Sequence, residues 1–157
     1  MERRNLLTPR KPFCLLLGIL SLMMIAGCAG SKPYLGDITE FSYHYGSYFG
    51  GYYEYDLVLQ DDAVHFTARG LNGVELDIDK EVDPSVLDDL SSAISDNHLE
   101  TWDGFSESND NVLDGYSFVL NVAYDDDREL SAGGYEMHPN NYQKVHDELV
   151  EILESVD

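Results

Sequence analysis

The feature that most constrains the fold of this chain is an alternation of apolar and polar residues between positions 41 and 79. In the first run, Phe41, Tyr43 and Tyr45 occupy every second position. Successive side chains of a β-strand point to opposite faces of a sheet, so this pattern indicates strands with one buried face and one solvated face. Because the alternation recurs in three further runs, we predict four strands, the later ones over residues 53–59, 64–69 and 74–79.

Short turn segments separate these four runs. Residues 46–51 are rich in glycine, Asp61-Asp62 lies between the second and third runs, and Asn72-Gly73 precedes the fourth. Asn-Gly is typical of a two-residue hairpin, because both central positions of a type I′ turn need positive φ. We therefore expect a four-stranded antiparallel meander. The alternation also assigns four tyrosines to its core face: Tyr43, Tyr45, Tyr53 and Tyr55.

Two later segments have the spacing of amphipathic helices. Asp83 suits the N-cap and Pro84 the first helical position of one helix, which should end near Asn97. Apolar residues recur there every three or four positions, and they do so again near the C-terminus. The predicted buried stripe of the C-terminal helix is Tyr142, Val145, Leu149, Ile152 and Val156.

Between the two helices the alternation returns. A polar segment over residues 103–114 precedes an alternating run at 116–124, and an aspartate-rich turn leads to a short run at 128–132, which Gly133-Gly134 should end. The predicted order is ββββαββα. Runs of strands followed by separate helices favour an α+β fold, here an antiparallel sheet of about six strands with both helices packed on one face.

The N-terminus has the composition of a secretory signal peptide. Four basic residues within positions 1–11 precede the apolar stretch of residues 13–25, and small residues follow. That stretch is shorter than the roughly 20 apolar residues that a membrane-spanning helix needs. We therefore predict a cleaved signal, with an uncleaved signal anchor extending to Ala29 as the alternative.

The segment Ile25-Ala26-Gly27-Cys28 directly follows the apolar stretch. It resembles the bacterial lipobox, in which an aliphatic residue and two small residues precede a cysteine. The resemblance implies that the Cys28 thiol receives a diacylglyceryl group, that the chain is cut before it, and that acyl chains such as palmitate anchor the protein to a membrane. The layout of strands and helices is also similar to that of small bacterial lipoproteins, although no functional residue follows from this.

This prediction divides the chain into three parts. Residues 1–27 would be the cleaved lipoprotein signal peptide, residues 28–37 a lipidated tether, and residues 38–157 a single α+β domain. The resemblance implies a place in the cell envelope. The anchor would lie in the outer face of the cytoplasmic membrane, or in an outer membrane if the host has one.

The charge of the mature chain limits its partners. Cleavage removes four basic residues and one acidic residue. It leaves five basic residues, 29 acidic residues and a net charge of −24. Such a domain should be repelled by phosphates, which excludes nucleic acid as a partner. Our first explanation of the charge is solubility, with a saline habitat, a basic partner or a cation as alternatives. Because Cys14 leaves with the signal and Cys28 is lipidated, no disulfide is expected.

Three aromatic residues, Tyr48, Phe49 and Tyr52, lie in or beside the glycine-rich 46–51 loop, where a core position is less natural. Exposed aromatic residues on such a loop are typical of contacts with a protein or a cell-wall glycan. The alternative is a loop folded back on the sheet edge. We therefore expect a membrane-anchored, non-catalytic binding or interaction module.

Acidic clusters give a second hypothesis, a Ca²⁺-responsive structural lipoprotein. Asp103, Glu107, Asp110 and Asp114 supply oxygen ligands of the kind that Ca²⁺ prefers, although their spacing is irregular. No other cofactor is expected. Residues Asp125, Asp127, Glu129 and Glu136 have an EF-hand-like spacing, but Leu130 stands where that loop needs glycine. We predict a hairpin turn there instead.

The sequence offers little for catalysis. His44 and His65 fall on polar strand faces and could be neighbours across the sheet, yet two histidines are an incomplete zinc site. Gly-x-Ser-x-Gly and His-Glu-x-x-His motifs are absent from the sequence. We therefore expect no enzyme. The third hypothesis is a small cell-envelope hydrolase that uses a pair of carboxylates.

Overall fold

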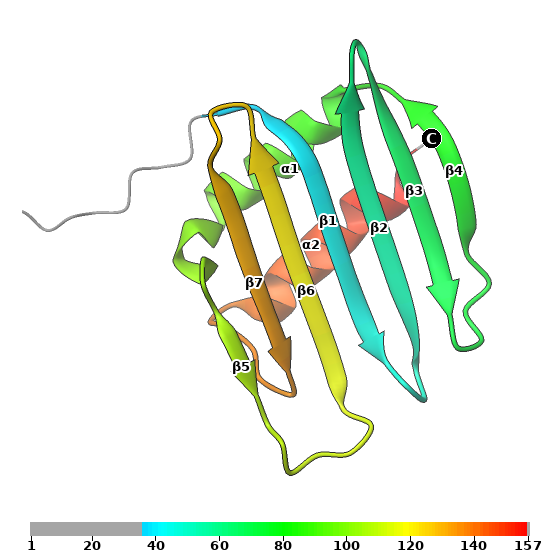
Figure 1. Ribbon diagram of the computed structural model, residues 1–157, viewed down its shortest axis with the longest axis vertical. Helices are drawn as coiled ribbons and strands as arrows, with labels where there is room; N and C mark the ends of the chain where they lie inside the picture. Colours follow the sequence, from blue (N-terminus) through cyan, green and yellow to red (C-terminus); the bar gives the residue numbers. More distant parts are fainter. Residues whose placement is uncertain (1–35, 157) are drawn as a thin grey trace, which may run out of the picture. The chain divides into compact units, whose positions relative to one another are not determined.

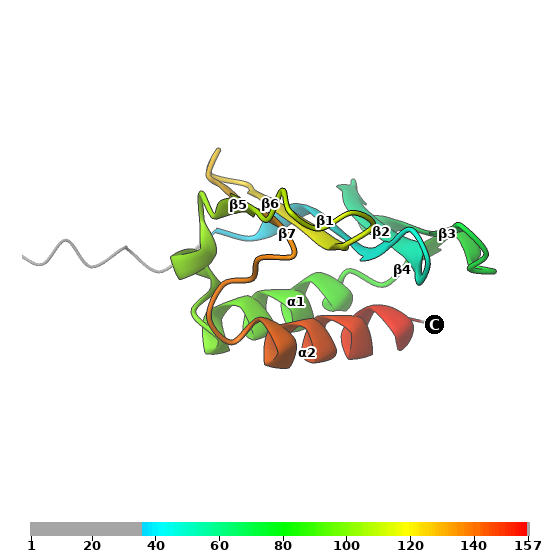
Figure 2. The ribbon, with the colours of Figure 1, turned by 90° about the horizontal axis from the view of Figure 1, so that it is seen from below.

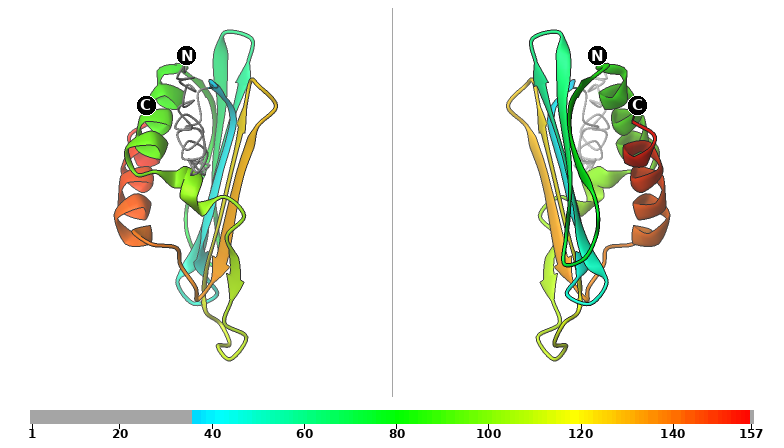
Figure 3. Two further views of the ribbon diagram at one scale, coloured as in Figure 1. Left: turned by 90° about the vertical axis from the view of Figure 1, so that its left-hand side faces the viewer. Right: turned by 90° about the vertical axis from the view of Figure 1, so that its right-hand side faces the viewer.

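A seven-stranded sheet forms one layer of the protein and two helices form the other (Figure 1). The computed structural model describes residues 36–156. The predicted signal peptide, Cys28 and most of the predicted tether lie outside the described residues. When the molecule of Figure 1 is seen from below and from its two sides, both helices lie on the same face of the sheet (Figures 2 and 3). The predicted α+β class is therefore confirmed.

The meander predicted from the alternation is present. It consists of β1 (Ile38–Ser47), β2 (Gly51–Gln60), β3 (Ala63–Leu71) and β4 (Asp77–Val82), each antiparallel to the next. β6 (Tyr116–Tyr124) pairs with the free side of β1, and β7 (Glu129–Tyr135) pairs with β6. The strand order is β4-β3-β2-β1-β6-β7-β5.

A seventh, short strand adds to the predicted sheet of about six. β5 (Ser106–Ser108) lies within the predicted polar segment and pairs in parallel with the end of β7. All three of its residues are exposed, so no apolar alternation marks it in the sequence. Backbone pairing at the sheet edge alone makes it a strand.

Two strand ends also differ from prediction. Gly133 and Gly134 lie inside β7 rather than ending it. A Cβ atom at Gly134 would lie 2.1 Å from the backbone oxygen of Met137, so glycine is needed there because the chain returns close to the strand. β4 begins at Asp77, because the turn after Gly70 extends to Leu76, whose oxygen accepts a 2.7 Å hydrogen bond from the Gly70 N–H.

The helices begin close to their predicted positions. Before α1 (Ser85–Asp96), the Asp83 carboxylate accepts a 2.9 Å hydrogen bond from the Ser85 N–H, and Asn97 follows the last helical residue. A short 3₁₀ helix, η1 (Leu99–Trp102), leads toward β5. The second long helix is α2 (Tyr142–Glu154). We predicted that Ile152 would be buried in this helix, but Leu153 is buried instead and Ile152 is half-buried. The side of α2 that packs on the sheet therefore includes Leu153.

The core lies between the helices and one face of the sheet. Phe41, Leu57, Phe66, Leu90 and Leu149 are among its fully buried side chains. α2 crosses the strands diagonally, and the ends of β1, β2 and β6 near the β1–β2 hairpin extend beyond the helices (Figures 1 and 3). Part of the helix-facing side of the sheet is thus left uncovered. Within residues 36–156, neither helix has the length and apolar character needed to span a membrane.

Candidate functional site

The β1–β2 hairpin exposes two aromatic rings at its tip. Tyr48 is 60% exposed and Phe49 is 81% exposed, and their rings meet edge to face with centroids 5.3 Å apart. The turn is tight because Gly46 adopts a φ of 141°, and a Cβ atom there would lie 2.1 Å from the Gly51 oxygen. Ser47 Oγ accepts a 3.0 Å hydrogen bond from the Gly50 N–H. The tip thus has a defined shape and does not fold its rings into the core.

Tyr52 does not belong to this exposed pair. It lies on β2 opposite Gly46 of β1 and Leu71 of β3, on the sheet face away from the helices, and is half-buried. The structure therefore brings together two of the three aromatic residues predicted for this loop. Tyr52 points the other way because it is already within the alternation of the strand.

Beside Phe49 lies a cavity of about 650 Å³ between the hairpin, the β3–β4 turn and the end of α2. Apolar and aromatic side chains form much of its lining, including Tyr53, Ile78, Leu153 and Val156. This volume lies within the range of roughly 300–1,000 Å³ that is usual for ligand sites. The exposed ring of Phe49 therefore stands at the rim of an accessible hollow.

A row of tyrosines crosses the sheet next to this cavity. Tyr116 on β6, Tyr45 on β1 and Tyr53 on β2 lie on the helix-facing side. The rings of Tyr45 and Tyr53 stack with centroids 5.0 Å apart, and those of Tyr45 and Tyr116 stack at 6.4 Å. Tyr45 is buried, whereas Tyr53 and Tyr116 are half-buried. The row is thus partly open to a ligand.

A hydrogen-bonded cluster connects this row to α2. The Tyr43 hydroxyl lies 2.8 Å from Nδ1 of His146 and 3.2 Å from the Tyr142 hydroxyl. The hydroxyl oxygens of Tyr142 and Tyr116 are 3.4 Å apart. Burial raises the pKa of Tyr43 and lowers the pKa of His146. The hydroxyl therefore stays protonated, and the neutral imidazole can accept its hydrogen bond at Nδ1.

Two further cavities continue along α2. One of about 710 Å³ lies at the start of the helix and is lined by Tyr116, His138, Tyr142 and His146, among others. The next, of about 480 Å³, shares His146 with the first and Glu154 with the cavity beside Phe49. Each of these three cavities shares a lining residue with the next along α2, and we call them together the α2 groove. It offers aromatic faces and neutral hydroxyl groups, an arrangement suited to binding.

The opposite face of the sheet carries two histidine–carboxylate pairs. His44 Nε2 lies 2.9 Å from the Asp56 carboxylate, and His65 Nε2 lies 3.3 Å from that of Asp79. The hydrogen bond with Asp56 raises the pKa of His44 and lowers that of Asp56. His44 and His65 are not on neighbouring strands, because β2 lies between β1 and β3. Each histidine has a carboxylate partner instead.

The four Ca²⁺ candidates do not converge. The Asp103 carboxylate accepts a 3.1 Å hydrogen bond from the Ser131 N–H, and that of Asp110 accepts one of 2.7 Å from Ser108 Oγ. Glu107 lies on β5, and Asp114 adopts a positive φ of 61° in the following loop. Within the described part of the chain, no group of three or more histidine, cysteine or acidic side chains is arranged to hold a metal ion.

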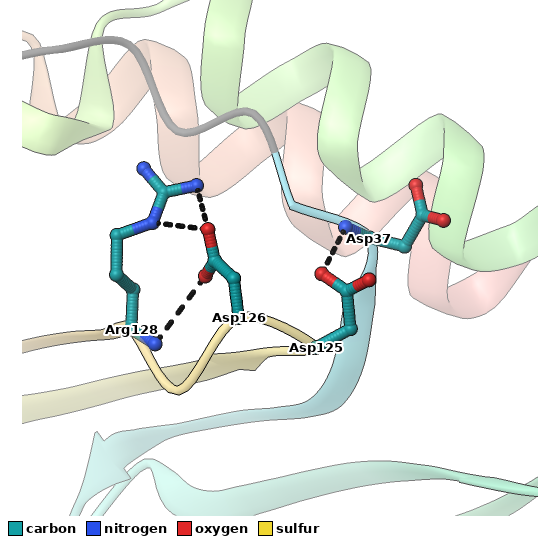
Figure 4. Close-up of polar contacts among 4 residues, drawn as sticks. All are labelled: Asp37, Asp125, Asp126 and Arg128. Carbon is teal, nitrogen blue, oxygen red and sulfur yellow. Dashed lines mark hydrogen bonds and ion pairs between the residues drawn. The ribbon is translucent and has the colours of Figure 1, made fainter.

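The acidic turn after β6 is a hairpin, as predicted (Figure 4). Asp125 Oδ1 accepts a 3.0 Å hydrogen bond from the Asp37 N–H, which joins the turn to the start of the domain. Asp126 forms an ion pair of 2.6 Å with Arg128. Asp127 turns the chain with a φ of 61°. The carboxylates of Asp125 and Asp126 thus have structural partners.

Sequence reasoning missed most of the α2 groove. It assigned Tyr43 and Tyr45 to the core but did not connect them with His138 or His146. The spacing of Tyr142, His146, Val150 and Glu154 at four-residue steps was the available signal, because residues four apart are neighbours on the surface of a helix. Which part of the sheet that side would meet depends on the diagonal placement of α2.

Fold and site together define a class of protein, an α+β domain with an aromatic groove beside its second helix and an exposed aromatic hairpin. No protein-family model matches the chain, and no curated protein matches it in sequence.

Proposed function

We propose that this chain is an exported lipoprotein whose domain is a non-catalytic binding module, held on a membrane of the cell envelope by lipid on Cys28. The basic, apolar and small-residue zones of the N-terminus and the lipobox-like Ile25–Cys28 segment support the anchor. One observation carries the binding role. It is the exposure of Phe49 and Tyr48 at a tightly built hairpin tip beside an accessible cavity.

The exposure of Phe49 has a measurable energetic consequence. A phenylalanine side chain buries on the order of 150–200 Å², and burial contributes about 25 cal/mol per Å². Because Phe49 is 81% exposed, covering it with a partner can contribute roughly 3 kcal/mol. A protein or a cell-wall glycan at the envelope surface is the partner class that we propose.

A pair of matched variants tests the binding role. Phe49→Ala in the full-length protein should reduce capture of an envelope partner at least tenfold, which corresponds to about 1.4 kcal/mol. Leu113→Ala is the control, because Leu113 is 87% exposed but lies in the loop before β6. The melting temperature should stay within about 1 °C for both variants, since neither side chain packs in the core. Equal capture by Phe49→Ala and the parent protein would rule out the hairpin as the contact.

A separate experiment tests the anchor. Cells expressing the parent chain and Cys28→Ala are grown with a labelled palmitate analogue and then fractionated. The parent chain should carry label and sediment with membranes, and its mature N-terminus should begin at residue 28. Cys28→Ala should carry no label. Labelling of Cys28→Ala at the level of the parent chain would refute lipid attachment at Cys28.

A further inference from the structure

We propose that the α2 groove binds an extended peptide segment that carries lysine or arginine, with the cationic groups held between tyrosine faces and the carboxylates of α2. This inference rests on the proposed function, since it names the chemistry of the partner that the hairpin and groove would contact. It comes from the shape of the groove, the position of its carboxylates and the charge of its lining.

The groove has the dimensions of a short extended peptide. Tyr142, His146, Val150 and Glu154 recur at four-residue steps along its helical side, so the groove follows α2 over nearly its whole length. At 1.5 Å per residue, this distance is about 18 Å. An extended chain advances about 3.3 Å per residue, so five or six residues would span it.

The groove places a carboxylate beside aromatic rings. Glu154 lines the cavity beside Phe49 together with Tyr53 and Tyr55. Burial raises the pKa of the Tyr55 hydroxyl, and the charge of Glu154 raises this pKa further. An ammonium or guanidinium group that enters here would meet both an aromatic face and a carboxylate. Both contacts favour cations.

The charges that line the groove favour a cationic occupant. Asp147, Glu151 and Glu154 are exposed on the groove side of α2. Lys144, at the other end of the groove, donates a 2.6 Å hydrogen bond to Asn97 Oδ1 and lies 4.0 Å from Glu148. Among the described residues, no ion pair neutralises Glu151 or Glu154.

A neutral glycan could also stack on the tyrosines, but it fits the charges less well. Covering Asp147, Glu151 and Glu154 removes water from their carboxylates, which is unfavourable unless an opposite charge compensates. A lysine- or arginine-bearing segment supplies that compensation. The net charge of the predicted mature chain, −24, would also speed the approach of a cationic partner.

The test measures binding of synthetic peptides to the full-length protein in detergent. The probe is a hexapeptide of alternating lysine and alanine, and its matched control has glutamine at each lysine position. A hexamer of N-acetylglucosamine represents a neutral glycan. The protein variants are Glu151→Gln/Glu154→Gln in the groove and Asp89→Asn/Asp96→Asn on α1. The α1 control removes the same two charges from exposed positions outside the groove.

We expect the lysine peptide to bind at least tenfold more tightly than the glutamine peptide. Glu151→Gln/Glu154→Gln should reduce the affinity for the lysine peptide at least tenfold. Asp89→Asn/Asp96→Asn should change that affinity less than twofold. Added NaCl should weaken binding, because exposed charge pairs are screened. Equal binding of both peptides, or equal effects of the two double variants, would overturn the inference.

A third comparison separates this inference from the proposed function. One outcome is that the neutral glycan binds, that Phe49→Ala reduces this binding, and that the lysine peptide binds no more tightly than the glutamine peptide. This outcome overturns the cationic-peptide inference and leaves the proposed binding module standing. If the lysine peptide depends on Glu151 and Glu154 but not on Phe49, the inference stands and the hairpin contact is refuted.

Discussion

The Tyr43→Phe substitution tests the buried cluster that joins the sheet to α2. Tyr43 is fully buried, and its hydroxyl lies within hydrogen-bonding distance of His146 Nδ1 and the Tyr142 hydroxyl. Phenylalanine keeps the ring but leaves both partners one hydrogen bond short. An unsatisfied buried polar group costs about 1–3 kcal/mol. Water can reach half-buried His146, so we expect a loss of about 1–2 kcal/mol in the free energy of unfolding.

Urea denaturation with an unchanged m-value measures this loss, and thermal unfolding should show a decrease in melting temperature of roughly 3–10 °C for a domain of this size. Tyr48→Phe is the matched control, because its hydroxyl is on an exposed side chain and should change stability by less than about 0.5 kcal/mol. A Tyr43→Phe variant as stable as the parent protein would refute the structural role of this hydroxyl.

The same variant should change the titration of His146. Burial lowers the pKa of His146 in the folded protein, so the unfolded chain binds more protons just below pH 6.5. The contribution of this group therefore makes the protein less stable as the pH falls below 6.5. The Tyr43 hydroxyl favours the neutral ring by donating to Nδ1, so Tyr43→Phe should raise the pKa of His146 toward 6.5 in an NMR titration. An unchanged pKa would contradict this donor role.

Three further changes test other parts of the structure. Gly46→Ala should destabilise the protein by at least about 2 kcal/mol in urea denaturation, because its Cβ atom would lie 2.1 Å from the Gly51 oxygen at a φ of 141°. The pairing of His44 with Asp56 raises the His44 pKa, so its stabilising contribution is complete well below pH 6.5 and is lost as the pH rises through the folded pKa. His44→Gln should remove that pH dependence from the unfolding free energy, and an unchanged dependence would assign it to another group. Leu149→Ala, in the fully buried stripe of α2, should cost about 2–5 kcal/mol, measured by the same denaturation.

The strands and helices were largely predictable because their signals are local. The alternation around Phe41 and Leu57 marks strands with one buried face, and the Asn72-Gly73 pair marks a turn that needs positive φ. β5 was not predictable, because three exposed polar residues carry no alternation and pair with β7 only through the backbone. Gly134 was predicted to end a strand. It lies inside β7 instead, where the absence of a side chain lets the Met137 backbone pass close to the strand.

The candidate site was predictable only in part. The glycine-rich loop indicated that Tyr48 and Phe49 would be exposed, because neither continues the alternation of the adjoining strands. Tyr52 was assigned to the same site but lies on the other face of the sheet, because strand geometry fixes its direction. The Ca²⁺ candidates are all acidic, but the fold does not bring their carboxylates together. Asp103 and Asp110 instead each accept a hydrogen bond from a nearby residue.

The sequence by itself therefore determined six of the seven strands and both long helices, which of their faces are apolar, and the net charge that limits the partners. These properties depend on neighbouring residues and on simple sums, so no knowledge of the fold is needed. Only the tertiary structure decided that α2 crosses the sheet diagonally, brings His146 to Tyr43 and places Glu154 at the cavity lined by Tyr53. The groove arises from that packing angle, which depends on contacts between residues about 100 positions apart.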